Sequence, residues 1–155
     1  MVRIIQAETG EEIAAARGLF LEYEGWLGLS LCFQGFEAEL ANLPGKYEGA
    51  EGRLLLAMVG EDAAGCIALR KLEDDICEMK RLFVRNEFRG QGIGQRLIER
   101  VIEDARAIGY GRMRLDTYPA KMGKAVELYR AYGFREIGAY YENPHEGTVF
   151  MELGL

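Results

Sequence analysis

The chain has 155 residues, of which 49% are hydrophobic, and this is enough apolar material for the core of one domain spanning residues 1–155. Its formal net charge of −6 argues against a general nucleic-acid binder, because neutralising a phosphate backbone requires clustered Lys and Arg in excess. The sequence has no basic, apolar leader and no apolar run long enough to span a membrane, so we expect no membrane partner.

The cysteine pattern argues against both a disulfide framework and a metal site. Cys32, Cys66 and Cys77 are odd in number, and no two of them have the CxxC spacing of a zinc or redox motif. We therefore expect no bound metal and a reducing location, the cytoplasm.

The chain opens with a strand and a long helix. Residues 2–6 have the composition of a strand. Thr9 then offers an N-cap, with Glu11 and Glu12 in the first turn, where carboxylates favour the helix dipole. The pattern predicts a helix that continues to about Leu27.

The hydrophobic period changes near residue 52. Before that point, Phe36, Leu40 and Leu43 recur at nearly helical spacing and stop at Pro44, which predicts a second, shorter helix. After it, three strand-like runs joined by short acidic turns predict an antiparallel meander over residues 53–59, 66–72 and 76–84.

The second half alternates helices and strands. Residues 93–108 keep a helical apolar spacing, and Gly109 supplies the stop. Residues 113–117 predict a short strand, Pro119 can open a further helix that ends before Gly133, and the last strands are predicted over 134–139 and 148–153. The element order predicts an α/β fold, with a mixed sheet of seven strands and about four helices on its faces.

A glycine-rich turn, RGQGIG at residues 89–94, connects a predicted strand to a predicted helix. Glycines at alternate positions expose consecutive backbone N–H groups beside the positive end of the helix, which is the geometry of a pyrophosphate site. A lone glycine turn would ordinarily be interpreted as a flexible connection. Two known phosphate motifs do not fit: a dinucleotide fingerprint needs Gly or Ala at Leu97, and a Walker loop needs Gly-Lys-Ser/Thr at residues 94–96.

Two spaced motifs, RGQGIG at residues 89–94 and AVELYRAYGF at residues 125–134, resemble those of the GNAT superfamily of acyl-CoA N-acyltransferases. Arg89, Gly92 and Gly94 fill the pattern R/Q-x-x-G-x-G/A that leaves the fourth strand of that family. Residues 125–134, AVELYRAYGF, are similar to its segment A-x-x-L-Y-x-x-x-G-F. With the element order, the resemblance covers almost the whole chain and is weakest over residues 24–52.

The resemblance implies a mostly antiparallel sheet that splays between its fourth and fifth strands, with acetyl-CoA as cosubstrate in the gap. The pantetheine arm would pair with the strand edge at Leu82, Phe83 and Val84. The pyrophosphate would be wrapped by Arg89, Gly90, Gln91, Gly92, Ile93, Gly94 and Gln95. Many members carry Asn three residues before the conserved Ala of the second motif, where this chain has Met122.

The resemblance also suggests two proton-transfer residues. Glu78 has the spacing to Arg89 of the general-base glutamate in histone-type members, acting directly or through water; the alternative is a surface glutamate paired with Lys80 or Arg81. Tyr129 matches the tyrosine that protonates the departing CoA thiolate, and the alternative is an aromatic residue packed in the core.

The predicted function is N-acetyl transfer from acetyl-CoA to a primary amine of a small molecule, an amino acid or a peptide, by direct attack in a ternary complex. A non-catalytic acyl-CoA-binding module is the main alternative, and a homodimer is compatible with the resemblance. By analogy, acceptors enter between the first two helices and the loop joining the last strands. Those regions contain Tyr23, Trp26, Leu29, Cys32, Phe33, Gln34, Tyr140, Tyr141, Glu142 and Asn143.

Overall fold

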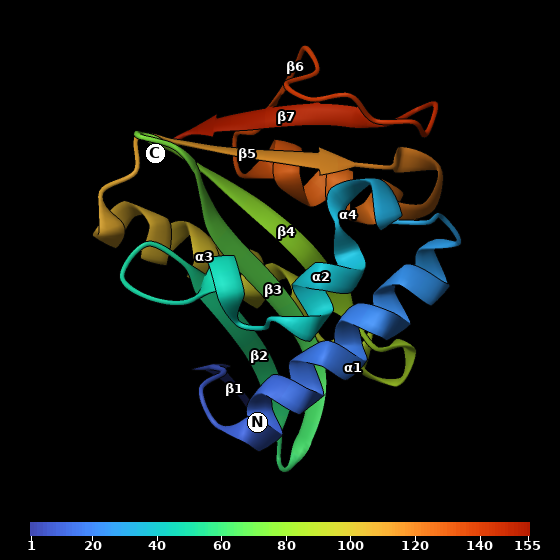
Figure 1. Ribbon diagram of the computed structural model, residues 1–155, viewed down its shortest axis with the longest axis vertical. Coiled ribbons are helices and arrows are strands. Elements are labelled where there is room, and N and C mark those ends of the chain that lie inside the picture. The colour runs from blue at the N-terminus through green and yellow to red at the C-terminus, as the bar shows by residue number, and fades with distance from the viewer.

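All seven predicted strands belong to one mixed sheet in the computed structural model, in the order β1-β2-β3-β4-β5-β7-β6 (Figure 1). The elements are β1 (Val2–Gln6), α1 (Gly10–Leu27), α2 (Phe36–Ala41), β2 (Arg53–Val59), β3 (Asp62–Glu73), β4 (Ile76–Val84), α3 (Ile93–Ile108), β5 (Arg112–Thr117), α4 (Pro119–Ala131), β6 (Arg135–Ile137) and β7 (Val149–Gly154). The structure describes residues 1–155, except for the side chain of Phe33, so the predicted acceptor contact of that ring lies outside the described residues.

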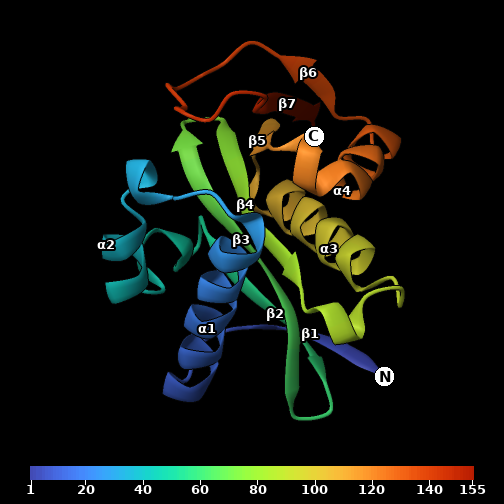
Figure 2. The ribbon, with the colours of Figure 1, turned by 90° about the vertical axis from the view of Figure 1, so that its right-hand side faces the viewer.

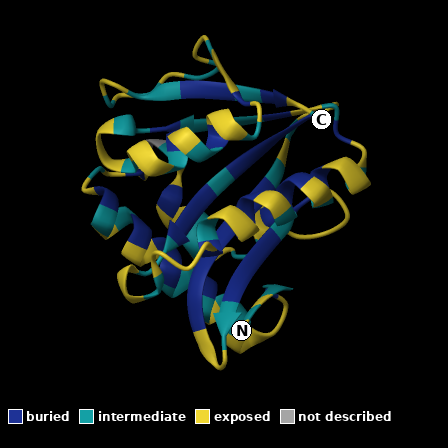
Figure 3. Ribbon diagram, turned by 180° about the vertical axis from the view of Figure 1, so that it is seen from behind, coloured by how far each residue is buried: buried dark blue, intermediate teal, exposed yellow. Residues whose placement is uncertain are grey.

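The sheet has helices on both faces, as Figure 2 shows, with α1 and α2 on one side and α3 and α4 on the other. Alternate residues of β2 serve the two faces: Leu54 and Leu56 join the core under α1, whereas Leu55 and Ala57 join the core under α3. Because of this layering, the strands are buried on both faces, and each helix is exposed only on its outward side (Figure 3). Within the described part of the chain, no helix is both long and apolar enough to cross a membrane.

The first helix begins where the sequence predicts. Thr9 is its N-cap and accepts a hydrogen bond from the backbone N–H of Glu12 at 3.2 Å, while the Glu12 carboxylate accepts one from the Thr9 N–H at 3.0 Å. This reciprocal pair satisfies two N–H groups that a helix start would leave without partners.

The sheet opens between β4 and β5. These parallel strands pair only at Ile76–Arg112, Cys77–Met113 and Glu78–Arg114, and then diverge. Beyond that point the pairing of β4 with β3 is irregular, and Arg81 has a φ of 62° in the left-handed region. The mixed, mostly antiparallel and splayed sheet that the sequence predicted is therefore confirmed.

Two strands, β3 and β6, differ from the prediction by more than one residue at one end. β3 begins at Asp62 rather than at residue 66, because the weakly strand-forming segment after Gly60 still pairs with β2, for example Gly65 with Ala57. β6 is shorter than predicted and ends at Ile137, where a loop over residues 138–148 begins. That loop returns toward the splayed end of the sheet.

Candidate active site

A cleft of about 710 Å³ lies between the free end of β4, the glycine turn and the start of α4. We call it the cofactor cleft, and it is lined by Trp26, Leu82, Phe83, Val84, Phe88, Arg89, Gly90, Gly92, Ile93, Gly94, Gln95, Pro119, Ala120, Lys121, Met122, Gly123, Lys124, Ala125 and Leu128. All the sequence-predicted cofactor residues except Gln91 are among them. The wall formed by α4 carries two cations, Lys121 and Lys124, that the sequence reasoning did not single out.

The glycine turn has the geometry of an anion site. Gly90 and Gly92 have φ values of 82° and 75°, which side chains with a Cβ rarely adopt. Gly92 is the N-cap of α3, with no side-chain cap and no acidic residue in the first turn. The first N–H groups of α3 are therefore available at the positive end of the helix. At Gly94 a Cβ would meet only Val84 Cγ2, at 3.8 Å, so neither its backbone nor a protein clash requires glycine there.

Trp26 belongs to this cleft rather than to the acceptor side suggested by analogy. Its ring lies under the Arg89 guanidinium, with Cζ 4.8 Å from the ring centroid, and near the Lys121 ammonium, with Nζ at 5.3 Å. It also packs on Phe83, with ring centroids 6.0 Å apart. These contacts connect α1 to both walls of the cleft through cation–π attraction.

Two further hollows lie on the other side of the splayed strands. The inner hollow, of about 30 Å³, is lined by Tyr23, Leu27, Leu29, Leu31, Gln34, Arg81, Asp116, Thr117, Tyr118, Met122, Asn143, His145 and Thr148. The outer hollow, of about 650 Å³, is lined by Ala139, Tyr141, Glu142, Asn143, Pro144, His145, Gly147, Thr148 and Phe150. The two share Asn143, His145 and Thr148 and so adjoin one another.

Met122 is the residue that the cofactor cleft and the inner hollow have in common. It has a non-helical φ of −117° at a kink in α4. Its sulfur lies 3.9 Å from the Tyr23 hydroxyl and 4.0 Å from the Thr117 hydroxyl. The cleft and the two hollows thus follow one another across the molecule, with Met122 at the boundary between the cleft and the inner hollow.

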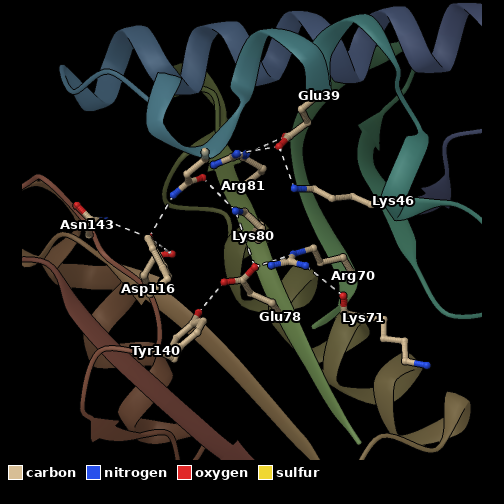
Figure 4. A network of polar contacts seen from close by, with 12 residues as sticks. Glu39, Lys46, Arg70, Lys71, Glu78, Lys80, Arg81, Asp116, Tyr140 and Asn143 are labelled. Atoms are coloured by element: carbon tan, nitrogen blue, oxygen red, sulfur yellow. Dashed lines mark hydrogen bonds and ion pairs between the residues drawn. The ribbon is translucent and has the colours of Figure 1, made fainter. Parts of the chain in front are cut away.

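Glu78 is buried at the last position of β4 that pairs with β5, with an exposed side-chain fraction of 2%. It accepts hydrogen bonds from Arg70 Nε at 2.8 Å and from the Tyr140 hydroxyl at 2.6 Å, and Lys80 Nζ lies 3.8 Å away (Figure 4). Burial alone would raise its pKa, but Lys80, Tyr140 and Arg70 together lower it below the usual glutamate value. Glu78 is therefore an ionised, fully partnered carboxylate rather than the surface residue of the alternative interpretation.

Tyr129 is buried on the inner face of α4, and its ring lies 5.6 Å from that of Phe134. Burial raises the pKa of its phenol far above the usual value, and the nearby Tyr23 and Asp116 raise it further. The group stays protonated at neutral pH. The preceding residue, Leu128, lines the cofactor cleft, whereas Tyr129 lines neither the cleft nor the two hollows.

Asp116 is a site residue that sequence reasoning missed. It lies on β5 beyond the last position paired with β4, and it lines the inner hollow. Its Oδ2 accepts a hydrogen bond from the Tyr141 hydroxyl at 2.8 Å. Burial raises the pKa of Asp116 above the usual aspartate value, although Lys80 and Tyr141 oppose the shift. The only sequence signal was its place at the end of a short strand.

The family model described as "Acetyltransferase (GNAT) family" matches residues 29–134. An uncharacterized N-acetyltransferase of Dictyostelium discoideum is 32% identical over 100% of this chain and 99% of its own. A GNAT-family acetyltransferase structure from Staphylococcus aureus has a TM-score of 0.81 at 22% identity and 99% coverage of both chains. One from Elizabethkingia anophelis with acetyl-CoA bound has a TM-score of 0.72 at 23% identity, covering 99% of this chain and 98% of its own. The chain therefore belongs to the GNAT acetyltransferase family and is an acyltransferase enzyme.

Proposed function

We propose that residues 1–155 act as one N-acetyltransferase domain that transfers the acetyl group of acetyl-CoA to a primary amine of a small molecule, an amino acid or a peptide. The observation that carries this proposal is the meeting of the cofactor cleft and the inner hollow at Met122. A thioester that reaches this boundary from one side and an amine that reaches it from the other are brought into contact for direct attack in a ternary complex.

The cofactor cleft suits an elongated acyl-CoA. The N–H groups at the start of α3 and the Arg89 guanidinium favour the pyrophosphate. Residues 82–84 of β4 have lost their pairing with β5, which leaves backbone groups on this edge for the amide groups of the pantetheine arm. The Val84 carbonyl is the exception, because it accepts a hydrogen bond from Arg89 Nε at 2.9 Å. The acetyl-CoA bound to the Elizabethkingia anophelis relative supports the same ligand here.

Tyr129 is proposed as the acid that protonates the CoA thiolate. Its raised pKa keeps the proton available at neutral pH, and a phenol is a stronger proton donor to a developing thiolate than water is. Glu78 is proposed as the general base. Each of its oxygens already has a partner and it lines neither the cleft nor the two hollows, so it acts through the Tyr140 hydroxyl or a water rather than by contact with the amine.

An acetyl-cysteine route is disfavoured. Cys77 lies in the core under α3, and burial raises the pKa of its thiol to about 12, so the nucleophilic thiolate is scarce at neutral pH. Cys66 is buried as well, and Cys32 is exposed; all three are free thiols, which agrees with the proposed cytoplasmic location.

The experiment is a screen of primary amines for amine-dependent release of CoA thiol, with the acetylated product identified by its mass. Calorimetry with acetyl-CoA, CoA and NAD is carried out in parallel. Tight binding of acetyl-CoA and CoA, no binding of NAD and turnover of at least one amine support the proposal. Tight binding of acetyl-CoA without turnover of any amine would instead indicate a non-catalytic acyl-CoA-binding module.

A further inference from the structure

The two carboxylates near the splayed strands differ in their access to the acceptor. Glu78 is paired with Arg70, Lys80 and Tyr140 and lines neither the inner nor the outer hollow. Asp116 faces it from β5, two residues beyond Arg114, and lines the inner hollow (Figure 4). A group that binds the acceptor directly has to be in contact with the hollow that the acceptor enters.

The hydrogen bonding of Asp116 leaves room for a ligand. Its Oδ2 accepts the Tyr141 hydroxyl, which itself receives hydrogen bonds from Asn143 Nδ2 at 2.9 Å and Gln34 Nε2 at 3.3 Å. Among the described residues, no side chain or backbone group donates to Oδ1. A carboxylate has about four acceptor positions, so an ammonium group can be bound without displacing Tyr141.

The size of the inner hollow limits what it can hold. Its volume of about 30 Å³ matches the space of a single amino group or water, so the rest of the acceptor must occupy the outer hollow of about 650 Å³. The shared residues Asn143, His145 and Thr148 mark the passage between the two. On the other side, Met122 separates Asp116 from the cofactor cleft.

We propose that Asp116 binds the ammonium group of the acceptor in the inner hollow and takes the proton that makes its nitrogen nucleophilic. This inference rests on the proposed N-acetyltransferase function, and it assigns the removal of the ammonium proton to Asp116 in place of Glu78. Asp116 removes one proton from the ammonium, and the free nitrogen attacks the thioester carbon. The C–S bond breaks after the C–N bond forms, and the thiolate receives the Tyr129 proton. The second proton lost by nitrogen returns to the Tyr129 phenolate, and Asp116 releases its proton to solvent.

The raised pKa of Asp116 supports this assignment, because a base works best when its pKa approaches the working pH. The titratable and charged groups around Asp116 are Glu78, Lys80 and Arg81 on β4, Tyr23 on α1, Tyr129 on α4, and Tyr140, Tyr141 and His145 in the loop 138–148. None of the tyrosines ionises near neutral pH. Burial raises the pKa of Asp116, and the positive charge of Lys80 opposes this rise most strongly.

The test compares Asp116→Asn with wild type for amines of different pKa over a range of pH. The matched control is Asp104→Asn, which removes a carboxylate paired with Arg53 and Arg100 away from the hollows. We expect Asp116→Asn to lower kcat/KM for the amine about 100-fold at neutral pH, with acetyl-CoA affinity unchanged. The loss should shrink for weakly basic amines and at high pH, where the amine arrives already deprotonated. Asp104→Asn should keep wild-type kcat/KM.

A folding defect is separable from this loss. Because the folded state raises the pKa of Asp116, its ionised form destabilises the fold above that pKa, so Asp116→Asn should melt no lower than wild type at neutral pH. Wild-type kcat/KM in Asp116→Asn, or a loss that is equal for all amines and at every pH, would overturn the inference alone. If wild type turns over no amine, the proposed function and the inference are both overturned.

Discussion

The Arg81 guanidinium forms a two-pronged ion pair with the Glu39 carboxylate, with Nε–Oε2 and Nη2–Oε1 distances of 3.0 and 2.9 Å. Both side chains are only 3% exposed. Arg81 lies at the irregular position where β4 leaves β5, and Glu39 belongs to α2. The pair therefore links α2 to β4 at the point where β4 and β5 separate.

Glu39→Gln should destabilise the protein strongly, because it leaves Arg81 buried without a counter-charge. Breaking a buried pair in this way costs about 3–5 kcal/mol, which corresponds to a Tm about 10 °C lower for a chain of this size. The matched control is Glu37→Gln, which changes an exposed glutamate of the same helix and should stay within about 0.5 kcal/mol of wild type. Equal melting temperatures for the two variants would show that the ion pair does not stabilise the fold.

The same pair predicts how stability responds to acid. Burial pushes the pKa of Glu39 upward, but the hydrogen bonds and charge of Arg81 outweigh it and lower the pKa below the usual value. A lowered folded-state pKa stabilises the fold above the unfolded-state pKa, and this stabilisation is lost as the pH falls through the folded-state value. Urea unfolding at a series of acidic pH values should show a shallower decline for Glu39→Gln than for wild type. Parallel declines would be inconsistent with this linkage.

Local patterns in the sequence were sufficient for most of the fold and for the glycine turn at the start of α3. The N-cap at Thr9, the stop at Gly109 and the glycine turn depend on neighbouring residues, so a single sequence reveals them. The Arg81–Glu39 pair joins residues 42 positions apart across an irregular strand, and no local pattern encodes that contact. Asp116 was missed for a related reason: its importance comes from the divergence of β4 and β5, which leaves it lining a hollow.

The two glycines that flank the start of α3 should respond differently to alanine. Gly92→Ala places a Cβ at a φ of 75°, which costs about 1 kcal/mol, whereas Gly94→Ala lies within a helix and should stabilise it by about 0.5–1 kcal/mol. Both residues line the cofactor cleft, so calorimetry should find acetyl-CoA binding at least about tenfold weaker in both variants. Undiminished binding by Gly94→Ala would mean that the pyrophosphate does not approach that backbone closely.

Tyr129→Phe should lower kcat by about 100-fold while the affinity for acetyl-CoA stays unchanged, because the substitution removes the proposed acid but keeps the buried ring. The control is Tyr132→Phe at the C-cap of α4, three residues after Tyr129, whose hydroxyl donates to Glu99 at the surface at 2.6 Å. That variant should retain the wild-type kcat. Full activity in Tyr129→Phe would assign the residue to core packing alone.

The central claim is that acetyl-CoA and the amine occupy the protein together and meet at the boundary marked by Met122. Its most direct test is the initial rate of CoA release when acetyl-CoA and the most active primary amine are varied independently. Direct attack in a ternary complex predicts double-reciprocal lines that intersect. Parallel lines, which indicate that CoA leaves an acetylated enzyme before the amine binds, would contradict the account.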